Sequence, residues 1–325
     1  MFARRRNASH PAVRQAAVEA LEGRQLMSST LLAGGYLKVV GTAGNDTIQL
    51  TRDTTYVYVK ENGVQSKFAA GGVTAVAVYG QEGNDVISLA ANITTPSTLN
   101  GGIGNDTLTG GSGKDDLIGD AGDDTLDGGL GADRILGGSG TDTVSYASRT
   151  TPVTINVPDP KKLYAPDDGA AGEGDIIFVD NERFQGGAGN DVFVGTDAAE
   201  RFYGNGGKDS ISAGGGNDVI FGGDGDDTID AGAGNDTVFA GAGNDFIYGK
   251  AGDDFIMGEA GDDFIDGDVG ADRISGGLGL DTAAYHMRTK DLRVTLDDTA
   301  DDGEAGEFDN VMADVESVLG GWGND

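Results

Sequence analysis

Residues 186–284 decide the fold, because they repeat with a period of nine. Cut in nines, they read GGAGNDVFV, GTDAAERFY, GNGGKDSIS, AGGGNDVIF, GGDGDDTID, AGAGNDTVF, AGAGNDFIY, GKAGDDFIM, GEAGDDFID, GDVGADRIS and GGLGLDTAA. A shorter block, 101–145, repeats in the same way. Glycine recurs at the first, second and fourth places, which indicates a tight turn with positive φ or close backbone approach. The last three places form a minimal strand.

The middle residue of each short strand is apolar and is expected to point inward. These residues are Leu108, Leu117, Leu126, Ile135, Val144, Phe193, Phe202, Ile211, Ile220, Ile229, Val238, Ile247, Ile256, Ile265, Ile274 and Ala283. A three-residue strand with one inward side chain cannot stand alone, so a fixed period predicts a solenoid. Two turns per coil give 18 residues per coil and two parallel sheets. Burying one Ile or Phe contributes about 1.5–3 kcal/mol. Ordering nine residues costs more, at about 1 kcal/mol or more each, so another interaction must hold the turns.

An acidic side chain occupies the sixth place of nearly every repeat. The aspartates there are Asp106, Asp115, Asp124, Asp133, Asp142, Asp191, Asp209, Asp218, Asp227, Asp236, Asp245, Asp254, Asp263, Asp272 and Asp281. In an 18-residue coil every second one lies in the same row, about 4.8 Å from the next. Like charges at that spacing repel unless a cation lies between them. Carboxylates and turn carbonyls form an all-oxygen site, which favours Ca²⁺ over Mg²⁺ or Zn²⁺. We therefore predict these aspartates as ligands of multiple Ca²⁺ ions.

These repeats resemble the RTX, or haemolysin-type, calcium-binding nonapeptide G-G-x-G-x-D-x-U-x over most of residues 101–325. The resemblance implies an all-β parallel β-roll. It also implies that Ca²⁺ binds between successive turns on each edge, held by the sixth-place Asp and by turn carbonyls. The repeat at 195–203 departs from the pattern, with Ala198 at the fourth place and Glu200 at the sixth. We expect no full site there.

Composition limits the partners and the compartment. The chain has 54 acidic and 22 basic residues, a net charge of −32, no cysteine and two histidines. This charge disfavours nucleic acids and anionic membranes as partners. The acids are periodic, which favours metal ligation over the alternative of a solvated or disordered chain. No apolar run is long enough for membrane insertion. Weak extracellular-type Ca²⁺ sites are filled only outside the cell, so we expect a secreted or cell-surface protein.

Residues 1–30 differ from the rest and form a sorting-like segment, helical or disordered. VEALEGRQLMSS at 18–29 looks like the LEPR-type N-terminal segment of large bacterial surface proteins, with Leu21, Glu22, Arg24, Leu26 and Ser28 matching and Gly23 in place of Pro. The alternative is an ordinary N-terminus.

Residues 31–100 are predicted to be a β-rich capping region with degenerate repeats at 41–49 and 80–88. Asp46 and Asp85 are possible ligands there. Asn62-Gly63 between alternating apolar residues indicates a hairpin.

Two acidic excursions interrupt the roll. Residues 146–185 separate the first block, 101–145, from the second, 186–284, and residues 285–325 follow. DDGAAGEGD at 167–175 matches DDGEAGEFD at 301–309. These acids either bind further Ca²⁺ or form a plain acidic loop. The final GGWGND stops inside a nonamer, so the sequence is a fragment or leaves its last turn open.

An outward column of large side chains is expected on one sheet, at Tyr203, Phe221, Phe239 and Met257. It either packs against residues 146–185 or another chain, or stacks across strands to stiffen the sheet.

Catalytic motifs are missing: there is no HExxH, no GxSxG and no phosphate-binding loop. We predict a non-enzymatic, secreted or cell-surface calcium-binding repeat protein that folds on binding Ca²⁺ and has a structural or adhesive role. The alternative is a Ca²⁺-dependent binding or secretion module of a larger extracellular enzyme or polysaccharide-binding protein. A surface polysaccharide and self-association are the open partners.

Overall fold

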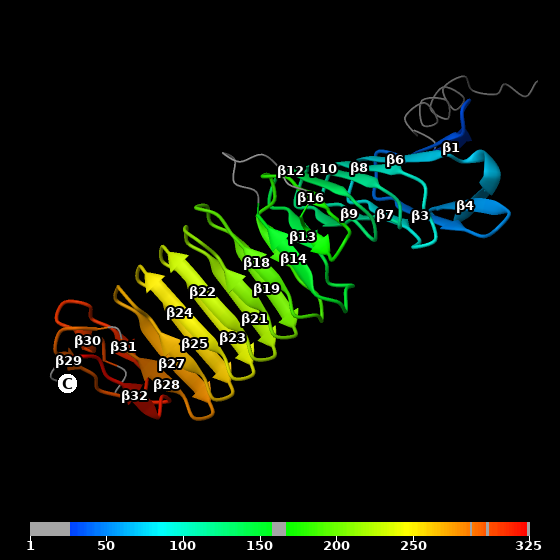
Figure 1. Cartoon of the computed structure of the whole chain (residues 1–325). Helices are drawn as coiled ribbons and strands as arrows, with labels where there is room; N and C mark the ends of the chain where they lie inside the picture. The colour runs from blue at the N-terminus through cyan, green and yellow to red at the C-terminus, as the bar shows by residue number, and fades with distance from the viewer. Residues whose placement is uncertain (1–26, 158–166, 287, 297–298, 324–325) are drawn as a thin grey trace, which may run out of the picture.

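The protein is an elongated solenoid whose coils stack along one axis (Figure 1). The computed structural model describes residues 27–157, 167–286, 288–296 and 299–323. Within these ranges there is no α-helix, and the one helical turn is the 3₁₀ segment η1 (Ala70–Gly72). The predicted all-β parallel roll is confirmed.

One sheet of 14 strands runs the length of the molecule. In spatial order its strands are β5 (Val64–Ala69), β4 (Tyr56–Glu61), β3 (Thr47–Arg52), β7 (Val86–Leu89), β9 (Thr107–Thr109), β11 (Thr125–Asp127), β13 (Thr143–Ser145), β17 (Arg183–Gln185), β19 (Arg201–Gly206), β21 (Val219–Asp224), β23 (Thr237–Ala242), β25 (Phe255–Ala260), β27 (Arg273–Leu278) and β31 (Asn310–Val311). We call it the continuous sheet.

Two further sheets divide the opposite side of the solenoid. The N-terminal one contains β1 (Ser28–Leu31), β2 (Tyr36–Val40), β6 (Ala75–Glu82), β8 (Ser97–Ile103), β10 (Asp115–Ala121), β12 (Arg134–Ser139) and β16 (Ile176–Ile177). The C-terminal one contains β15 (Gly169–Ala170), β14 (Val153–Asn156), β18 (Val192–Val194), β20 (Ser210–Ser212), β22 (Thr228–Ala233), β24 (Phe246–Ala251), β26 (Phe264–Asp266), β28 (Thr282–Ala284) and β32 (Ser317–Leu319). A separate pair joins β29 (Leu292–Arg293) to β30 (Gly303–Glu304).

The strand register follows the 18-residue coil. Ile220 pairs with Val238, and Val238 with Ile256, in parallel ladders. The side chains predicted to point inward, from Leu108 to Ala283, are all at most 1% exposed and form one core. The core of the regular coils therefore consists of two facing columns of apolar residues, one from each sheet, as the period predicts.

The fourth place of the regular turns is glycine because consecutive coils nearly touch there. At Gly234, where φ is +134°, an added Cβ would lie 1.4 Å from the carbonyl oxygen of Gly216 on the preceding coil. No side chain fits into that space, so the turns stack backbone on backbone.

Residues 31–100 already belong to the stack. β3 and β7 pair in parallel, and Ile48 and Ile87 share the core with the later repeats. The hairpin at Asn62-Gly63 is confirmed, since it joins β4 to β5. At the N-terminal end β1 pairs antiparallel with β2 and covers the edge of the N-terminal sheet. Residues 1–26, which carry most of the LEPR-like resemblance, lie outside the described residues.

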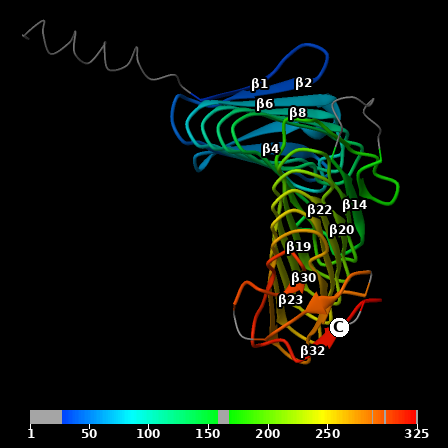
Figure 2. The same ribbon diagram turned by 90° about the vertical axis from the view of Figure 1, so that its left-hand side faces the viewer.

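The first excursion changes which sheet faces the continuous sheet. Its strand β16 ends the N-terminal sheet on β12, whereas its strand β14 begins the C-terminal sheet on β18. Its strand β17 continues the continuous sheet between β13 and β19. Figure 2 shows strands of the first half running across the view and those of the second half running down it. The excursion thus replaces regular coils where the flattened roll turns.

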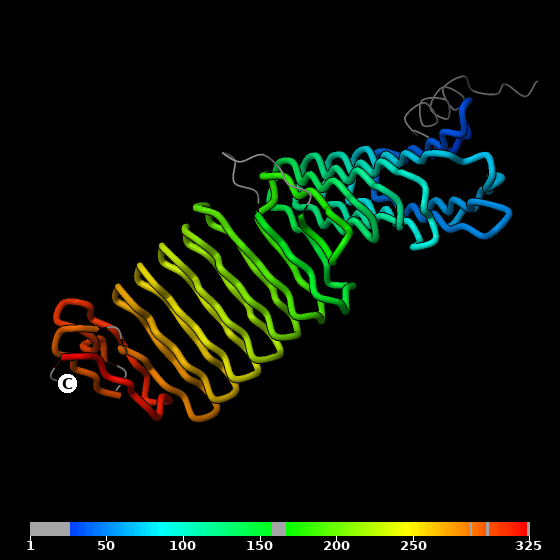
Figure 3. Tube along the Cα trace, in the orientation of Figure 1, coloured from blue at the N-terminus to red at the C-terminus, as the bar shows by residue number. Residues whose placement is uncertain are grey.

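The second excursion repeats this arrangement at the C-terminal end, where the trace leaves the regular coils (Figure 3). β29 pairs antiparallel with β30, as β14 does with β15. β31 then pairs with β27 and β32 with β28.

Removing an inward aromatic side chain should lower the free energy of unfolding. The fully buried Phe202 ring stacks on Phe184 and meets Phe193 edge-on, each at a ring-centroid distance of 5.8 Å. We expect Phe202→Ala to cost about 3–5 kcal/mol in saturating Ca²⁺, measured by urea unfolding. Val194→Ala, at a site 43% exposed, is the control and should change it by less than about 0.5 kcal/mol. Equal effects would contradict the inward assignment.

Candidate metal sites along the edges of the roll

The sixth-place carboxylates form rows along the edges of the solenoid. Each row is joined by hydrogen bonds from one coil to the next. For example, the backbone N–H of Asp227 donates to Oδ1 of Asp245, and that of Asp245 donates to Oδ1 of Asp263, at 2.8 and 2.9 Å. The same bond recurs between the other regular coils. The register therefore brings like carboxylates together along each edge.

The second oxygen of these carboxylates has no partner. Oδ2 is buried without a hydrogen bond in Asp106, Asp124, Asp133, Asp142, Asp209, Asp218, Asp227, Asp236, Asp245, Asp254, Asp263, Asp272 and Asp281, and Oδ1 is in Asp115. These are all of the predicted ligands except Asp191. A buried acceptor without a donor costs about 1–3 kcal/mol, and more if charged. Each such oxygen therefore calls for a positive partner.

Asp191 differs from the other predicted ligands because protein donors satisfy both of its oxygens. Oδ1 accepts the N–H of Val153 at 2.8 Å, and Oδ2 accepts the N–H of Gly187 in its own turn at 2.7 Å. It is the sixth-place residue of the first repeat after the first excursion. Asp191 thus has a hydrogen-bond donor on each oxygen, unlike the other predicted ligands.

Glu200 likewise bonds within its own turn. Its carboxylate accepts the N–H of Thr196 at 3.2 Å and the Thr196 hydroxyl. Glu200 is absent from the set with partnerless buried oxygens. The geometry agrees with the expectation of no full site in the repeat at 195–203.

Backbone carbonyls lie beside the partnerless oxygens. An added Cβ at Gly222 would lie 2.6 Å from Asp227 Oδ2 and 2.4 Å from the carbonyl oxygen of Ala240 on the next coil. Gly119 stands in the same relation to Asp124 Oδ2 and the Gly137 carbonyl, at 2.2 and 2.5 Å. Carboxylate and carbonyl oxygens therefore converge at the first place of the turn.

The donor set suits a hard cation that accepts mixed oxygen ligands, as Ca²⁺ does. Among the described residues, no three or more acidic or histidine side chains gather around one point. A site must therefore combine carboxylates from adjacent turns with carbonyls. The ion would neutralise the rows and give the partnerless oxygens a ligand bond.

Burial raises the pKa of the row carboxyls, and neighbouring carboxylates raise it further in several of them. The hydrogen bond from the neighbouring backbone N–H opposes this. The pKa reaches about 6 for Asp227 and Asp245, about 7 for Asp254 and Asp263, and about 8 for Asp272. Ionisation at neutral pH is thus costly unless a cation is present.

Other carboxylates continue the rows: Asp85, which the sequence indicated as a possible ligand, and two glutamates that were not among the predicted ligands. Asp85 has a partnerless buried Oδ2 and follows Asp46 in its row. Asp142 N–H donates to Glu182 at 2.9 Å, and Asp281 N–H to Glu316 at 2.9 Å. Both glutamates stand two residues before an apolar residue of a short strand, as a sixth place does. That spacing is the signal that could have found them.

The excursions also continue the rows, but with protein donors. Asp175 accepts the N–H of Asp133 at 2.9 Å through Oδ1, as in the roll, and the Tyr146 hydroxyl at 2.9 Å through Oδ2. In the second excursion Asp309 accepts the N–H of Asp272 at 3.0 Å and the Tyr285 hydroxyl at 3.1 Å. Tyrosine hydroxyls thus occupy the positions left open in the roll turns.

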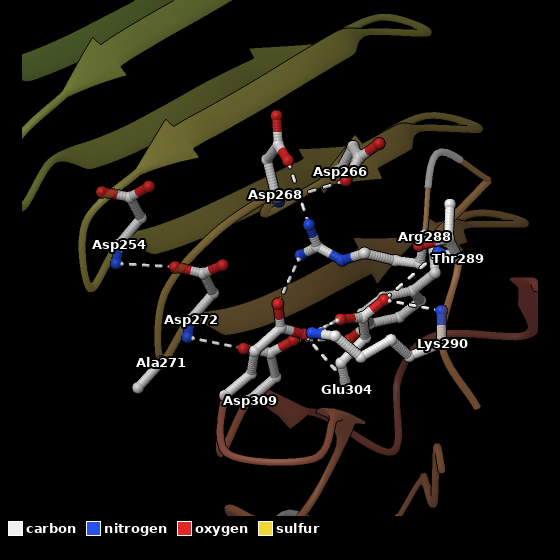
Figure 4. A network of polar contacts seen from close by, with 12 residues as sticks. Asp254, Asp266, Asp268, Ala271, Asp272, Arg288, Thr289, Lys290, Glu304 and Asp309 are labelled. Carbon is white, nitrogen blue, oxygen red and sulfur yellow. Dashed lines mark hydrogen bonds and ion pairs between the residues drawn. The ribbon is translucent and has the colours of Figure 1, made fainter. Parts of the chain in front are cut away.

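An arginine adds positive charge to each excursion. Arg149 lies 3.4 Å from Glu173, and Arg288 lies 3.2 Å from Glu307 and 3.1 Å from Asp268. Figure 4 shows Asp254, Asp272 and Asp309 in succession, with the Arg288 side chain extending toward Asp268. Protein donors thus satisfy Asp175 and Asp309 in the excursions, which favours the acidic-loop interpretation over further Ca²⁺ sites, although Oδ1 of Asp314 is buried without a partner.

Taken together, the fold and its edges define a parallel β-roll with repeated all-oxygen cation sites. The family description "RTX calcium-binding nonapeptide repeat" matches residues 97–126, 109–144, 178–211, 194–229, 212–247, 221–256 and 248–283. The chain therefore carries RTX calcium-binding nonapeptide repeats, as its resemblance implied, and multiple Ca²⁺ ions are its cofactors. No curated protein matches the chain.

Proteins with these repeats are generally extracellular. In the described parts of the chain, no helix has the length and apolar character needed to cross a membrane.

Neutralising one row carboxylate should remove Ca²⁺ without unfolding the roll. Asp245→Asn keeps an oxygen for the N–H of Asp227 but loses the charge. We expect about one or two fewer bound ions per chain, because each carboxylate borders two turns. Isothermal titration calorimetry measures the number. The matched control is Asp253→Asn, at an exposed fifth place, which should leave the number of bound ions unchanged. An unchanged number in Asp245→Asn would contradict the assignment.

Stability should depend on pH in opposite ways with and without Ca²⁺. In chelator, folded-state pKa values of about 6–8 exceed the unfolded value near 3.8. The folded state therefore binds more protons, and its stability is greatest at low pH and is lost as pH rises through 6–8. With Ca²⁺, protons compete with the ion, so the Ca²⁺ midpoint for folding should rise as pH falls from 8 to 6.

Urea unfolding in chelator and Ca²⁺ titrations, each at several pH values, measure these two trends. A calcium-free roll that becomes more stable as pH rises would show that the row carboxylates are not buried as described.

Removing a tyrosine hydroxyl should weaken an excursion without changing Ca²⁺ binding. Tyr285→Phe leaves Asp309 Oδ2 without its donor, which costs about 1–3 kcal/mol in the free energy of unfolding. The number of bound Ca²⁺ ions should stay the same. Tyr248→Phe is the control, on the outer face of β24. A lower Ca²⁺ number in Tyr285→Phe would instead place an ion in the excursion.

Proposed function

We propose that this chain is a non-enzymatic, secreted or cell-surface structural protein whose roll folds when it binds Ca²⁺ outside the cell. One observation carries the proposal. Along both edges of the roll, buried carboxylate oxygens recur on successive coils without a hydrogen-bond partner. These oxygens oppose folding where Ca²⁺ is scarce and support it where Ca²⁺ is abundant.

The energetics link folding to the compartment. The unfolded chain spreads its net charge of −32 through solvent, whereas folding stacks part of it in buried rows. Ca²⁺ bound only to the folded state shifts the equilibrium toward it. Sites of extracellular affinity, with Kd of about 10⁻⁴–10⁻³ M, would leave the chain unfolded in the cytosol and fold it after export.

A structural role without catalysis fits the way in which the acidic residues are used. The row carboxylates with raised pKa values repeat from coil to coil, which is the pattern of a scaffold rather than of one reaction centre. We infer that the roll acts as a stiff, elongated spacer at the cell surface.

A second candidate is a Ca²⁺-dependent binding module for a surface polysaccharide. The observation that favours it is the outward face of the continuous sheet, where arginines and aromatic rings lie together on an otherwise acidic protein.

Far-UV circular dichroism during a Ca²⁺ titration, with Mg²⁺ as control, tests the proposed function. We expect a cooperative transition from coil to β-structure near millimolar Ca²⁺ and none with Mg²⁺. A chain that is fully folded in chelator at neutral pH would contradict calcium-driven folding after export.

A further inference from the structure

The outward face of the continuous sheet, from β17 to β27, differs from the rest of the surface. Its side chains come from the seventh and ninth places of the repeats. Among them are Arg183, Arg201, Arg273, Tyr203, Phe221 and Phe239, and none of the positions holds an acidic residue. We call it the arginine–aromatic face. Asp314, which accepts the Ser275 hydroxyl at 2.7 Å, marks its C-terminal end.

Aromatic rings form the middle of this face. The ring centroids of Tyr203 and Phe221 are 5.0 Å apart, and those of Phe221 and Phe239 are 5.1 Å apart, with nearly parallel planes. Phe255 meets Phe239 edge-on at 6.2 Å. The predicted cross-strand stacking is therefore present. The rings remain only half-buried, because no described segment lies over them.

Two arginines lie side by side at one end of the face. Arg183 and Arg201 are paired in register on the adjacent strands β17 and β19, about 4.8 Å apart at the backbone. Neither forms an ion pair within the described residues. Arg273, at the other end, packs over the Phe255 ring at 5.4 Å and also has no acidic partner there.

Several other basic side chains of the coils pair with an acid on a neighbouring coil. Arg134 lies 3.3 Å from Asp116, and Lys250 lies 3.9 Å from Asp230. Arg183 and Arg201 are adjacent and yet form no ion pair within the described residues, on a chain with a net charge of −32. Their mutual repulsion is relieved by an anion, and the guanidinium fork matches a carboxylate.

We propose that the arginine–aromatic face binds a linear polysaccharide that carries carboxylates along its chain. Four strand spacings separate Arg201 from Arg273, which is about 19 Å. An extended glycan laid along the solenoid axis spans this length. Its carboxylates contact the arginines at either end, and the apolar C–H faces of its sugar rings contact the aromatic rows between them.

Other occupants fit the face less well. An extended peptide cannot add as a strand, because β19 to β25 already have hydrogen-bonded neighbours on both sides. A second copy related by two-fold symmetry would bring the same arginines against one another. The flat, elongated, cationic and aromatic face is complementary to an acidic sugar chain in both charge and shape.

The test uses the full chain loaded with Ca²⁺ and a hexamer of galacturonate, measured by isothermal titration calorimetry. We expect the hexamer to bind and its fully methyl-esterified, neutral form not to bind. The double variant Arg183→Gln/Arg201→Gln should weaken binding by about tenfold or more. Phe221→Ser/Phe239→Ser should also weaken it. Arg134→Gln, on the N-terminal sheet, is the control and should bind as the parent does.

Three results would overturn the proposal. If the double arginine variant binds as tightly as the parent, the glycan is held elsewhere, for instance by Ca²⁺ at the acidic turns. If hexaglutamate binds as tightly as the galacturonate hexamer, the face recognises negative charge and not the sugar rings. If the parent protein does not bind the hexamer, or if it dimerises through this face, the face is not a glycan site.

The inference rests on the calcium-loaded roll of the proposed function, and circular dichroism of each sample separates the two claims. Loss of Ca²⁺-dependent folding contradicts the proposed function. Folded protein that does not bind the hexamer contradicts only this inference.

Discussion

Repulsion between stacked carboxylates is the constraint on which the rest of the structure depends. The 18-residue coil that aligns the inward apolar side chains also aligns the sixth-place aspartates. In most turns one oxygen of the carboxylate helps to set the register by accepting a backbone N–H from the adjacent coil. The other is buried without a donor in most turns. These oxygens call for a cation, and the proposed function depends on the resulting link between calcium concentration and folding.

The excursions answer the same constraint without a metal. Asp175 and Asp309 sit in carboxylate rows, yet tyrosine hydroxyls fill the position where the roll leaves an oxygen open. Arginines offset part of the remaining charge. Roll blocks and excursions alternate along the chain. We expect bound calcium to stabilise the roll blocks and side-chain hydrogen-bond donors to stabilise the excursions.

The nine-residue period was sufficient to predict the roll, its inward residues and its edge rows, because each coil contacts only its neighbours. It could not predict that Asp191 is satisfied, since this depends on an N–H from Val153 in the excursion and one from Gly187. The change of sheets at residues 146–185 also escaped prediction. There Thr154 of β14 pairs with Val192, 38 residues away, and Ile176 of β16 pairs with Arg134, 42 residues away, in place of the 18-residue spacing of the regular coils. Glu182 and Glu316 stand two residues before an apolar strand residue, as a sixth place does. They were not predicted because the glycines that normally precede a sixth place are missing.

Anomalous scattering from crystals grown in Ca²⁺ tests the central claim most directly. The account predicts peaks in rows along both edges, between consecutive turns, beside the oxygens of residues such as Asp227, Asp245 and Asp263. It predicts none beside Asp175 or Asp309. Peaks confined to the exposed fifth-place side chains or to the excursions, with the row oxygens bonded to protein or water instead, would contradict it.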